Sequence, residues 1–229
     1  MRLQTKSISA LFPCGAVNSG MMCLTAAALC WVWLSSGLKK ELIVSMKTVV
    51  VFLADGFEEC EALLAVDLLR RAGIQTIMAS VMGRLEVPSS RKILIKADAL
   101  TENVDYSNAD MIVLPGGRVG TENLRKSEVV KSGCLEFAKE GKYLAAICAA
   151  PSILDELGVL DGKQATCHPD YESKMQGAIV TGESVSIDDK VITGQGLGAG
   201  FPFAFELVRV MAGESEVERI KTAICYDGR

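Results

Sequence analysis

From residue 46 onward, short apolar runs alternate with longer segments in which apolar and polar residues repeat with helical spacing. The clearest runs are apolar throughout, as in strands buried on both faces of a sheet. The pattern predicts strands at residues 48–53, 74–80, 111–114 and 143–147, a less buried strand at 93–97, and short strands at 164–167, 185–187 and 191–193.

The segments between these runs predict helices. Residues 58–72 place Leu63, Val66 and Leu69 on one face, followed by Gly73 as a helix stop. Further helices are expected at residues 124–139, from Pro151 to just before Gly158, and at 201–211. Because strands and helices alternate, we expect a mostly parallel sheet with helices on both faces and functional residues at the carboxyl ends of strands.

The chain divides into a leader, residues 1–45, and a single domain, residues 46–229, in which no repeat or linker interrupts the pattern. The apolar core of the leader, residues 21–34, is short for a membrane-spanning helix. It fits a signal-peptide core or a transit peptide. The favoured interpretation is an early start codon, with Met46 as the true start, because Met46 leads directly into the first strand. A membrane role is expected only if the leader is retained.

Charge and cysteine content narrow the function classes. The net charge is −4, with +3 in residues 1–45 and −7 in the remainder, so a nucleic-acid partner is not expected. Eight cysteines occur without any C-x-x-C pair, and His168 is the single histidine, which disfavours a zinc module. Scattered cysteines are typical of a reducing compartment, so we expect a cytoplasmic protein.

Cys148 is the first candidate for chemistry, because it stands where a buried strand turns into a helix. This is the position of a nucleophile elbow, whose tight turn needs small neighbours, here Ala146 and Ala150. The start of the following helix is expected to lower the pKa of the thiol. The alternative is an inert cysteine in the core.

Three other groups are candidates to assist Cys148. Glu61 lies one turn into the helix that begins near Glu58, where it could meet the thiol with a raised pKa and transfer a proton. Acidic residues at a helix start are also explained by the helix dipole alone. His168 occupies a loop, where a histidine is more often a surface residue. Gly116 and Gly117 follow a strand and could present backbone N–H groups to an oxyanion, or form only a turn.

Other motifs are missing. The glycine-rich segment 194–200 does not match G-x-G-x-x-G, so a dinucleotide site is not expected. No P-loop, G-x-S-x-G or metal-ligand spacing is present, and no cofactor is predicted.

From Met46 to near its C-terminus, the chain resembles the ThiJ/PfpI superfamily, in particular bacterial-type relatives in its DJ-one branch, typified by the Parkinson-disease-associated protein deglycase. The matching stretches are ADGFEECEA, VDLLRRAG, SSR, VLPGG, AAICAAP and ATCHP. The resemblance implies a flavodoxin-like three-layer α/β sandwich that forms a homodimer.

The resemblance also assigns the site. It implies Cys148 as the reactive cysteine, Glu61 as its carboxyl partner and His168 as a nearby histidine. Gly116 and Gly117 match a backbone N–H site, and Arg91 matches an arginine near the site across the dimer interface.

Three departures from the family stand out. Ala149 replaces the histidine that follows the cysteine in the protease-like branch, which argues against peptidase activity and leaves Ala149 in the oxyanion and substrate region. Gln195 and Leu197 replace an arginine and a proline of the human-type protein. Cys167 is a second thiol that either lies near the site or is simply buried.

The resemblance implies a cofactor-independent glyoxalase or deglycase that acts on methylglyoxal, glyoxal or their early adducts through a hemithioacetal on Cys148. The alternative is a stress protein that senses oxidation at Cys148, with chaperone-like activity.

Overall fold

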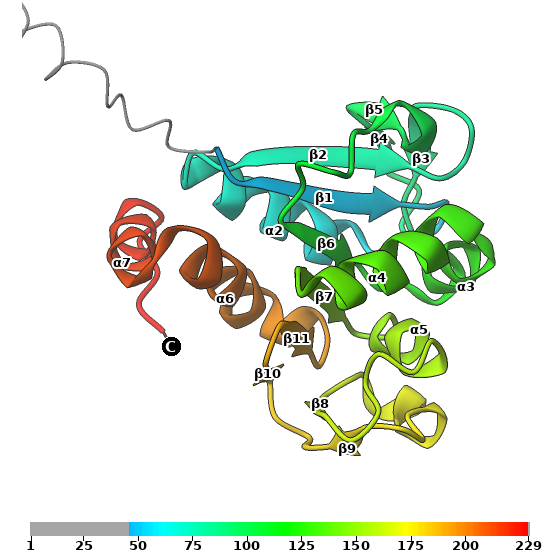
Figure 1. Ribbon diagram of the computed structural model, residues 1–229. Coiled ribbons are helices and arrows are strands. Elements are labelled where there is room, and N and C mark those ends of the chain that lie inside the picture. Colours follow the sequence, from blue (N-terminus) through cyan, green and yellow to red (C-terminus); the bar gives the residue numbers. More distant parts are fainter. Residues whose placement is uncertain (1–45, 229) are drawn as a thin grey trace, which may run out of the picture. The chain divides into compact units, whose positions relative to one another are not determined.

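A seven-stranded sheet forms the centre of the computed structural model, which describes residues 46–228 (Figure 1). Its strands follow the order β10-β11-β7-β6-β1-β2-β5, and all neighbours are parallel except β10 and β11. The strands are β1 (Thr48–Leu53), β2 (Gln75–Ser80), β5 (Ala99–Leu100), β6 (Met111–Leu114), β7 (Tyr143–Ile147), β10 (Val185–Asp188) and β11 (Val191–Gly194).

Two small pairs of strands lie outside this sheet, the first antiparallel and the second parallel. The first joins β3 (Glu86–Pro88) to β4 (Leu94–Lys96), and the second joins β8 (Gln164–Ala165) to β9 (Ile179–Val180). Three short 3-10 helices complete the connections: Thr101–Asn103, Pro169–Lys174 and Leu197–Ala199.

Helices cover both faces of the main sheet, as the three-layer prediction requires (Figure 1). One face is covered by α2 (Glu59–Arg71), α6 (Gly200–Ala212) and α7 (Glu214–Ala223), and the other by α3 (Arg118–Lys126), α4 (Glu128–Glu140) and α5 (Pro151–Glu156).

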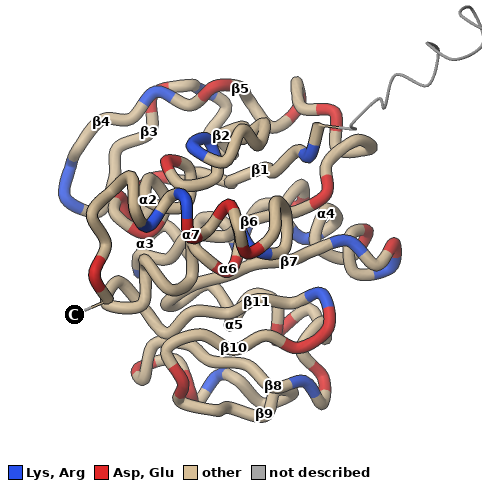
Figure 2. The backbone as a smooth tube through the Cα atoms, turned by 90° about the vertical axis from the view of Figure 1, so that its left-hand side faces the viewer, with Lys and Arg blue, Asp and Glu red and all other residues tan. Residues whose placement is uncertain are grey.

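Strand β1 shows why the central strands are apolar throughout. Its alternate residues Val49 and Val51 pack against the α2 side, while Val50 and Phe52 pack against the α4 side. A strand between two helical layers therefore has no polar face. The central strands β1, β6 and β7 carry no charged residue, and charges lie on the surrounding helices and loops (Figure 2).

Most predicted elements are confirmed, but the helix expected at residues 124–139 begins later than predicted, at Glu128. The chain forms two helices there, α3 and α4, because Ser127 adopts an extended conformation between them and its hydroxyl accepts from Val130 N–H. Ser127 therefore follows the last residue of α3 and is the N-cap of α4. Residues 93–97 contain β4, which lies outside the main sheet, and the sequence analysis missed α7.

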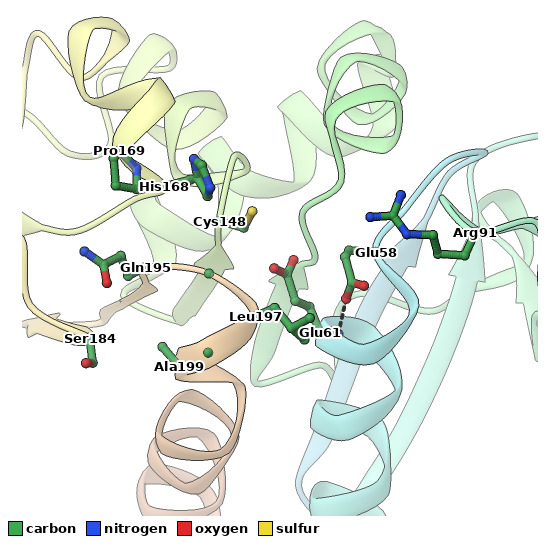
Figure 3. Close-up of a pocket in the computed structure, with 12 residues that line it drawn as sticks. Glu58, Glu61, Arg91, Cys148, His168, Pro169, Ser184, Gln195, Leu197 and Ala199 are labelled. Atoms are coloured by element: carbon green, nitrogen blue, oxygen red, sulfur yellow. Dashed lines mark hydrogen bonds between the residues drawn. The ribbon is translucent and has the colours of Figure 1, made fainter.

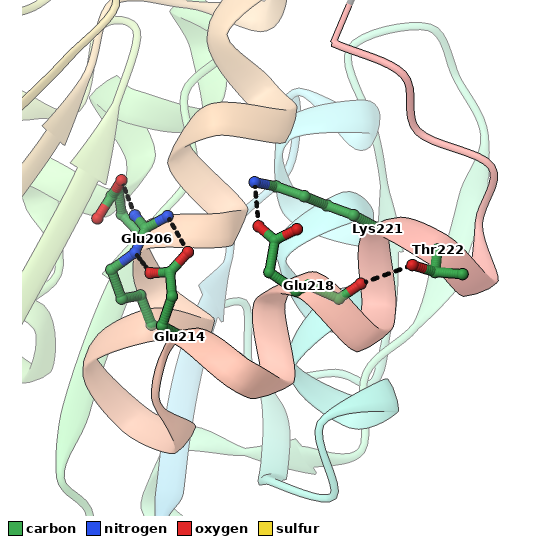
Figure 4. Close-up of polar contacts among 6 residues, drawn as sticks. Glu206, Glu214, Glu218, Lys221 and Thr222 are labelled. Carbon is green, nitrogen blue, oxygen red and sulfur yellow. Dashed lines mark hydrogen bonds and ion pairs between the residues drawn. The ribbon is translucent and has the colours of Figure 1, made fainter.

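The turn from α6 into α7 is held by ion pairs (Figure 4). Arg209 near the end of α6 pairs with Glu206 on the same helix and with Glu214 at the start of α7. Within α7, Lys221 pairs with Glu218 at 2.8 Å. The two helices thereby cover the α2 side of the sheet as one layer.

The leader predicted for residues 1–45 lies outside the described residues. Within residues 46–228, no helix is long and apolar enough to cross a membrane.

Candidate active site

Cys148 lies in a strained turn between β7 and α5. Its backbone φ is +65°, in the left-handed region that residues other than glycine seldom adopt. Its N–H donates to the Gly194 carbonyl at 2.9 Å, and its carbonyl accepts from His168 N–H at 2.8 Å. Both small neighbours, Ala146 and Ala150, are fully buried. The turn therefore has the geometry predicted for a nucleophile elbow.

Glu61 brings a buried carboxyl to this turn from the first turn of α2. The Glu58 carboxylate caps the helix and accepts from Glu61 N–H at 2.7 Å, which fixes the direction of the Glu61 side chain. Glu61 is only 2% exposed. Its Oε2 accepts from Gly116 N–H at 2.9 Å, while its Oε1 has no hydrogen-bond partner among the described residues.

Burial raises the pKa of the Glu61 carboxyl to about 7, and the charge of Glu58 adds to the shift. The Cys148 thiol and the Gly116 N–H oppose it and lower the pKa. Glu61 therefore exchanges a proton near neutral pH, as a general acid or base must. Its unpaired Oε1 is free to take part in that exchange.

The two glycines after β6 are required by the packing of the site. A Cβ on Gly116 would lie 2.6 Å from both Cys148 Cβ and Glu61 Oε2. Gly117 has a φ of +92°, and a Cβ there would lie 2.5 Å from the Gly56 carbonyl oxygen. Only glycine allows this close approach of β6, α2 and the Cys148 turn.

The backbone donors differ in part from the predicted pair. Gly116 N–H is already bonded to Glu61, so it positions the carboxyl. The N–H groups of Gly117 and Ala149 point to the Cys148 sulfur and lower the pKa of its thiol. Gly117 and Ala149 are therefore the donors placed to stabilise negative charge at the Cys148 sulfur.

The pKa of the Cys148 thiol changes in the direction opposite to the prediction. Burial and the negative charge of ionised Glu61 raise this pKa to about 12. The backbone N–H groups lower it, but by less. Because part of this rise comes from the negative charge of Glu61, protonation of Glu61 removes that part. The thiol and the carboxyl therefore act as a coupled pair.

These side chains line one cavity of about 490 Å³ (Figure 3). Cys148 lies between His168 and Glu61, and Arg91 reaches the cavity from the segment between β3 and β4. The arginine at position 91 thus lines the cavity of its own chain. The cavity is completed by Glu58, Pro169, Ser184 and residues 195–199.

His168 contacts Cys148 through its backbone. Its ring Nδ1 accepts from Asp170 N–H at 3.2 Å. The His168 side chain is 43% exposed. Within residues 46–228, no hydrogen bond joins the ring to the thiol. The ring borders the cavity and is placed to contact a bound substrate.

Two further contributors to the site were not predicted as site residues from the sequence. Glu58 caps α2, lines the cavity and raises the pKa of Glu61. The glycine-rich segment after β11 also lines the cavity, and Gln195 is held there by a bond from Nε2 to the Gly182 carbonyl at 3.2 Å. This segment directly follows the end of strand β11, and that position could have indicated from the sequence that it belongs to the site. Cys167 is fully buried in the core and lines no described cavity near Cys148.

Among the described residues, no group of three or more His, Cys, Asp or Glu side chains is placed to hold a metal ion. The five described cysteines are all free.

Comparisons with known proteins agree with this architecture. The model of the DJ-1/PfpI family matches residues 47–210. The chain is 34% identical to protein dj-1beta of Drosophila melanogaster over 176 residues, which covers 76% of this chain and 94% of that protein. It is 28% identical to the glutathione-independent glyoxalase DJR-1.2 of Caenorhabditis elegans over 186 residues, covering 80% and 98%.

The structure superposes on oxidized DJ-1 of Toxoplasma gondii with a TM-score of 0.76 and 31% identity, covering 79% of this chain and 99% of that one. The family model spans residues 47–210, a range that includes every residue of the site. The protein therefore belongs to the DJ-1/PfpI family.

Proposed function

We propose that this protein is a cofactor-independent glyoxalase that converts methylglyoxal and related 2-oxoaldehydes into 2-hydroxy acids. The main support is the pairing of Cys148 with a buried Glu61 whose pKa is raised to about 7. A relative named as a glutathione-independent glyoxalase, 28% identical, supports the same reaction class.

The reaction begins when the Cys148 sulfur adds to the aldehyde carbon. The thiol proton passes to Glu61 or to the new alkoxide, and a hemithioacetal forms. The N–H groups of Gly117 and Ala149 stabilise the oxyanion. This step needs no external thiol.

Glu61 then moves a proton between the two substrate carbons. It takes the proton from the carbon bonded to sulfur, an enediol forms, and the proton returns to the neighbouring carbon. The aldehyde carbon is thereby oxidised to a thioester, and the ketone carbon is reduced to an alcohol. Water hydrolyses the thioester, which releases the 2-hydroxy acid and regenerates the thiol.

The same chemistry extends to early adducts of these aldehydes on amines or thiols, the activity of a deglycase. The cavity of about 490 Å³ is larger than a three-carbon dicarbonyl requires, which leaves room for an attached group.

The test uses protein starting at Met46, methylglyoxal and no glutathione. Loss of dicarbonyl and formation of lactate are followed for wild type, Cys148→Ser and Glu61→Gln. Lactate is expected only when both residues are intact. Dicarbonyl loss without lactate indicates stoichiometric trapping by thiols and contradicts the proposal.

A second candidate function is oxidation sensing at Cys148. It is favoured by the unpaired Oε1 of Glu61, which when protonated can donate to an oxygen of a cysteine sulfinate. Mass spectrometry after mild peroxide treatment tests it, and the expected product is a sulfinic acid on Cys148 that Glu61→Gln destabilises. An unmodified Cys148 contradicts it, and chaperone-like activity would be tested on the oxidised protein.

The homodimer and the cytoplasmic location remain predictions. Ile93 and Leu94 on the β3–β4 hairpin are 49% and 63% exposed and offer apolar surface for a second copy. Sedimentation measures the oligomeric state, and fractionation of cells that express the full chain tests the location and the leader.

A further inference from the structure

Cys148 also borders a second hollow, which Glu61 does not line. This hollow measures about 180 Å³ and shares only Cys148 and His168 with the larger cavity; the rest of its lining is Ala149 and three residues with polar side chains. These three are Arg118, Asp170 and Tyr171. A substrate bonded to the Cys148 sulfur therefore has two directions in which to extend.

The second hollow leads into a third one. The third hollow measures about 350 Å³ and shares Arg118, Asp170 and Tyr171 with the second. It adds Glu122 and Lys174. The two hollows together form a groove, which we name the Arg118 groove, running from Cys148 along the start of α3 to Lys174.

Two cations of this groove make no ion pair at contact distance among the described residues, although the charge of Lys174 helps to lower the pKa of the Glu122 carboxyl. Within residues 46–228, neither Arg118 nor Lys174 makes an ion pair or a hydrogen bond from its side chain, although Lys174 lies 4.7 Å from the Tyr171 ring centre. Arg125 lies farther along, but Glu122, Glu156 and Ser152 already surround its guanidinium. The cations available to a ligand are therefore Arg118 and Lys174.

The groove also contains two acidic residues, Glu122 and Asp170. Glu122 is bound by Arg125, which lowers the pKa of the Glu122 carboxyl. Asp170 lies beside His168, with 3.7 Å between its Oδ2 and the ring Nδ1. Arg118 also follows directly after Gly117, whose N–H faces the Cys148 sulfur. The same turn thus places the backbone of Arg118 next to the Cys148 turn.

We propose that Arg118 and Lys174 form a subsite for an anionic group, a carboxylate or a phosphate, on the far end of a 2-oxoaldehyde bonded to Cys148. The proposal rests on the glyoxalase function above and names its preferred substrate class. A guanidinium binds either anion with two parallel hydrogen bonds, and an ammonium adds a second charge. Methylglyoxal, which is neutral and has three carbons, leaves the subsite empty.

The test compares two substrates of equal length. The anionic probe is 4,5-dioxopentanoate, whose carboxylate lies two methylenes beyond the ketone, and its product is 2-hydroxyglutarate. The neutral probe is 2-oxopentanal. The measured quantity is the ratio of kcat/KM for the anionic probe to kcat/KM for the neutral one, at constant ionic strength.

The wild type is expected to prefer the anionic probe. Arg118→Gln and Lys174→Gln are each expected to lower the ratio about fivefold or more, as for a charge-assisted contact at a partly exposed site. Lys126→Gln removes the same charge from the end of α3, outside the groove, and is expected to leave the ratio unchanged. Inorganic phosphate and acetate, added as competitors, tell which anion is preferred, and Arg118→Gln is expected to weaken that competition.

Several results overturn the proposal. Turnover of both probes with equal efficiency, or a ratio that is insensitive to Arg118→Gln and Lys174→Gln, rejects the subsite and leaves the glyoxalase function intact. A ratio that falls only in Arg91→Gln places the anionic end in the larger cavity and also rejects it. A wild type that turns over neither probe nor methylglyoxal rejects the proposed function, and the subsite with it.

Discussion

Glu61 accepts a hydrogen bond from the backbone N–H of Gly116 at 2.9 Å, and this bond ties helix α2 to the turn after β6. The bonded oxygen is the one that a Cβ on Gly116 would approach to 2.6 Å. The position of the Glu61 carboxyl therefore depends on the absence of a side chain at residue 116.

Gly116→Ala is expected to lower kcat/KM for methylglyoxal about 100-fold or more, because the new methyl group must displace both Glu61 and Cys148. Steady-state kinetics measures the loss. Gly133→Ala is the matched control, because residue 133 lies on α4 and a Cβ there meets only Ile112 Cδ1 at 3.4 Å. Equal activity in the two variants would contradict the arrangement of the site.

The pH dependence of kcat/KM is expected to follow Glu61. Burial raises the pKa of this carboxyl to about 7, so below that pH the free enzyme holds a proton on Glu61 and lacks its base. We expect kcat/KM to rise about tenfold per pH unit below pH 7 and to level off above it. A pH–rate profile from pH 5 to 9 measures this.

Glu58→Gln tests the cause of that midpoint. The negative charge of Glu58 raises the pKa of Glu61, and a glutamine keeps an oxygen that can accept from Glu61 N–H. The midpoint is therefore expected to move to lower pH in this variant. A profile without a transition near neutrality in wild type, or a midpoint unmoved by Glu58→Gln, would contradict the assignment.

The position of Cys148 could be predicted from sequence, because a strand buried on both faces leaves an uninterrupted apolar run. Strands β6 and β7 have the predicted bounds for this reason, and the residues that follow them stand at the edge where a site is expected. The sequence also placed Glu61 near the start of α2, but whether that turn faces this edge became clear only from the structure.

Other features depend on contacts between distant segments and left little signal in the sequence. The raised thiol pKa of Cys148 comes from burial and from Glu61, which is far away in the chain, whereas the sequence displayed only the nearby helix start. The bond between Gly116 and Glu61 likewise depends on how α2 packs against β6. The break between α3 and α4 at Ser127 was not predicted, because the residues on both sides have helical periodicity. The break is marked only by the Ser127 hydroxyl, which caps α4 by accepting from Val130 N–H.

Glu61 is expected to make stability depend on pH. Its pKa is raised from 4.5 to about 7 on folding, so between these values the folded state binds more protons than the unfolded state. The free energy of unfolding therefore falls as pH rises through this window, by an amount of the order of 3 kcal/mol at most. Glu61→Gln removes this term, so its stability relative to wild type should rise from pH 4.5 to pH 8.

Urea unfolding of both proteins at several pH values measures this difference. Only the difference between the two proteins is informative, because other groups titrate in the same range in both. A difference that stays constant with pH would show that folding does not raise the pKa of Glu61, which would contradict the prediction.

The backbone strain at Cys148 is expected to reduce stability. With a φ of +65°, a residue that has a Cβ costs about 1 kcal/mol more than glycine at this position. Cys148→Gly should therefore be more stable than Cys148→Ala by about that amount, although neither retains the nucleophile. Urea unfolding of the two variants measures the difference, and Ala149→Gly, at a residue without a positive φ, should instead be less stable than wild type. If Cys148→Gly is no more stable than Cys148→Ala, the turn does not hold the thiol by strain.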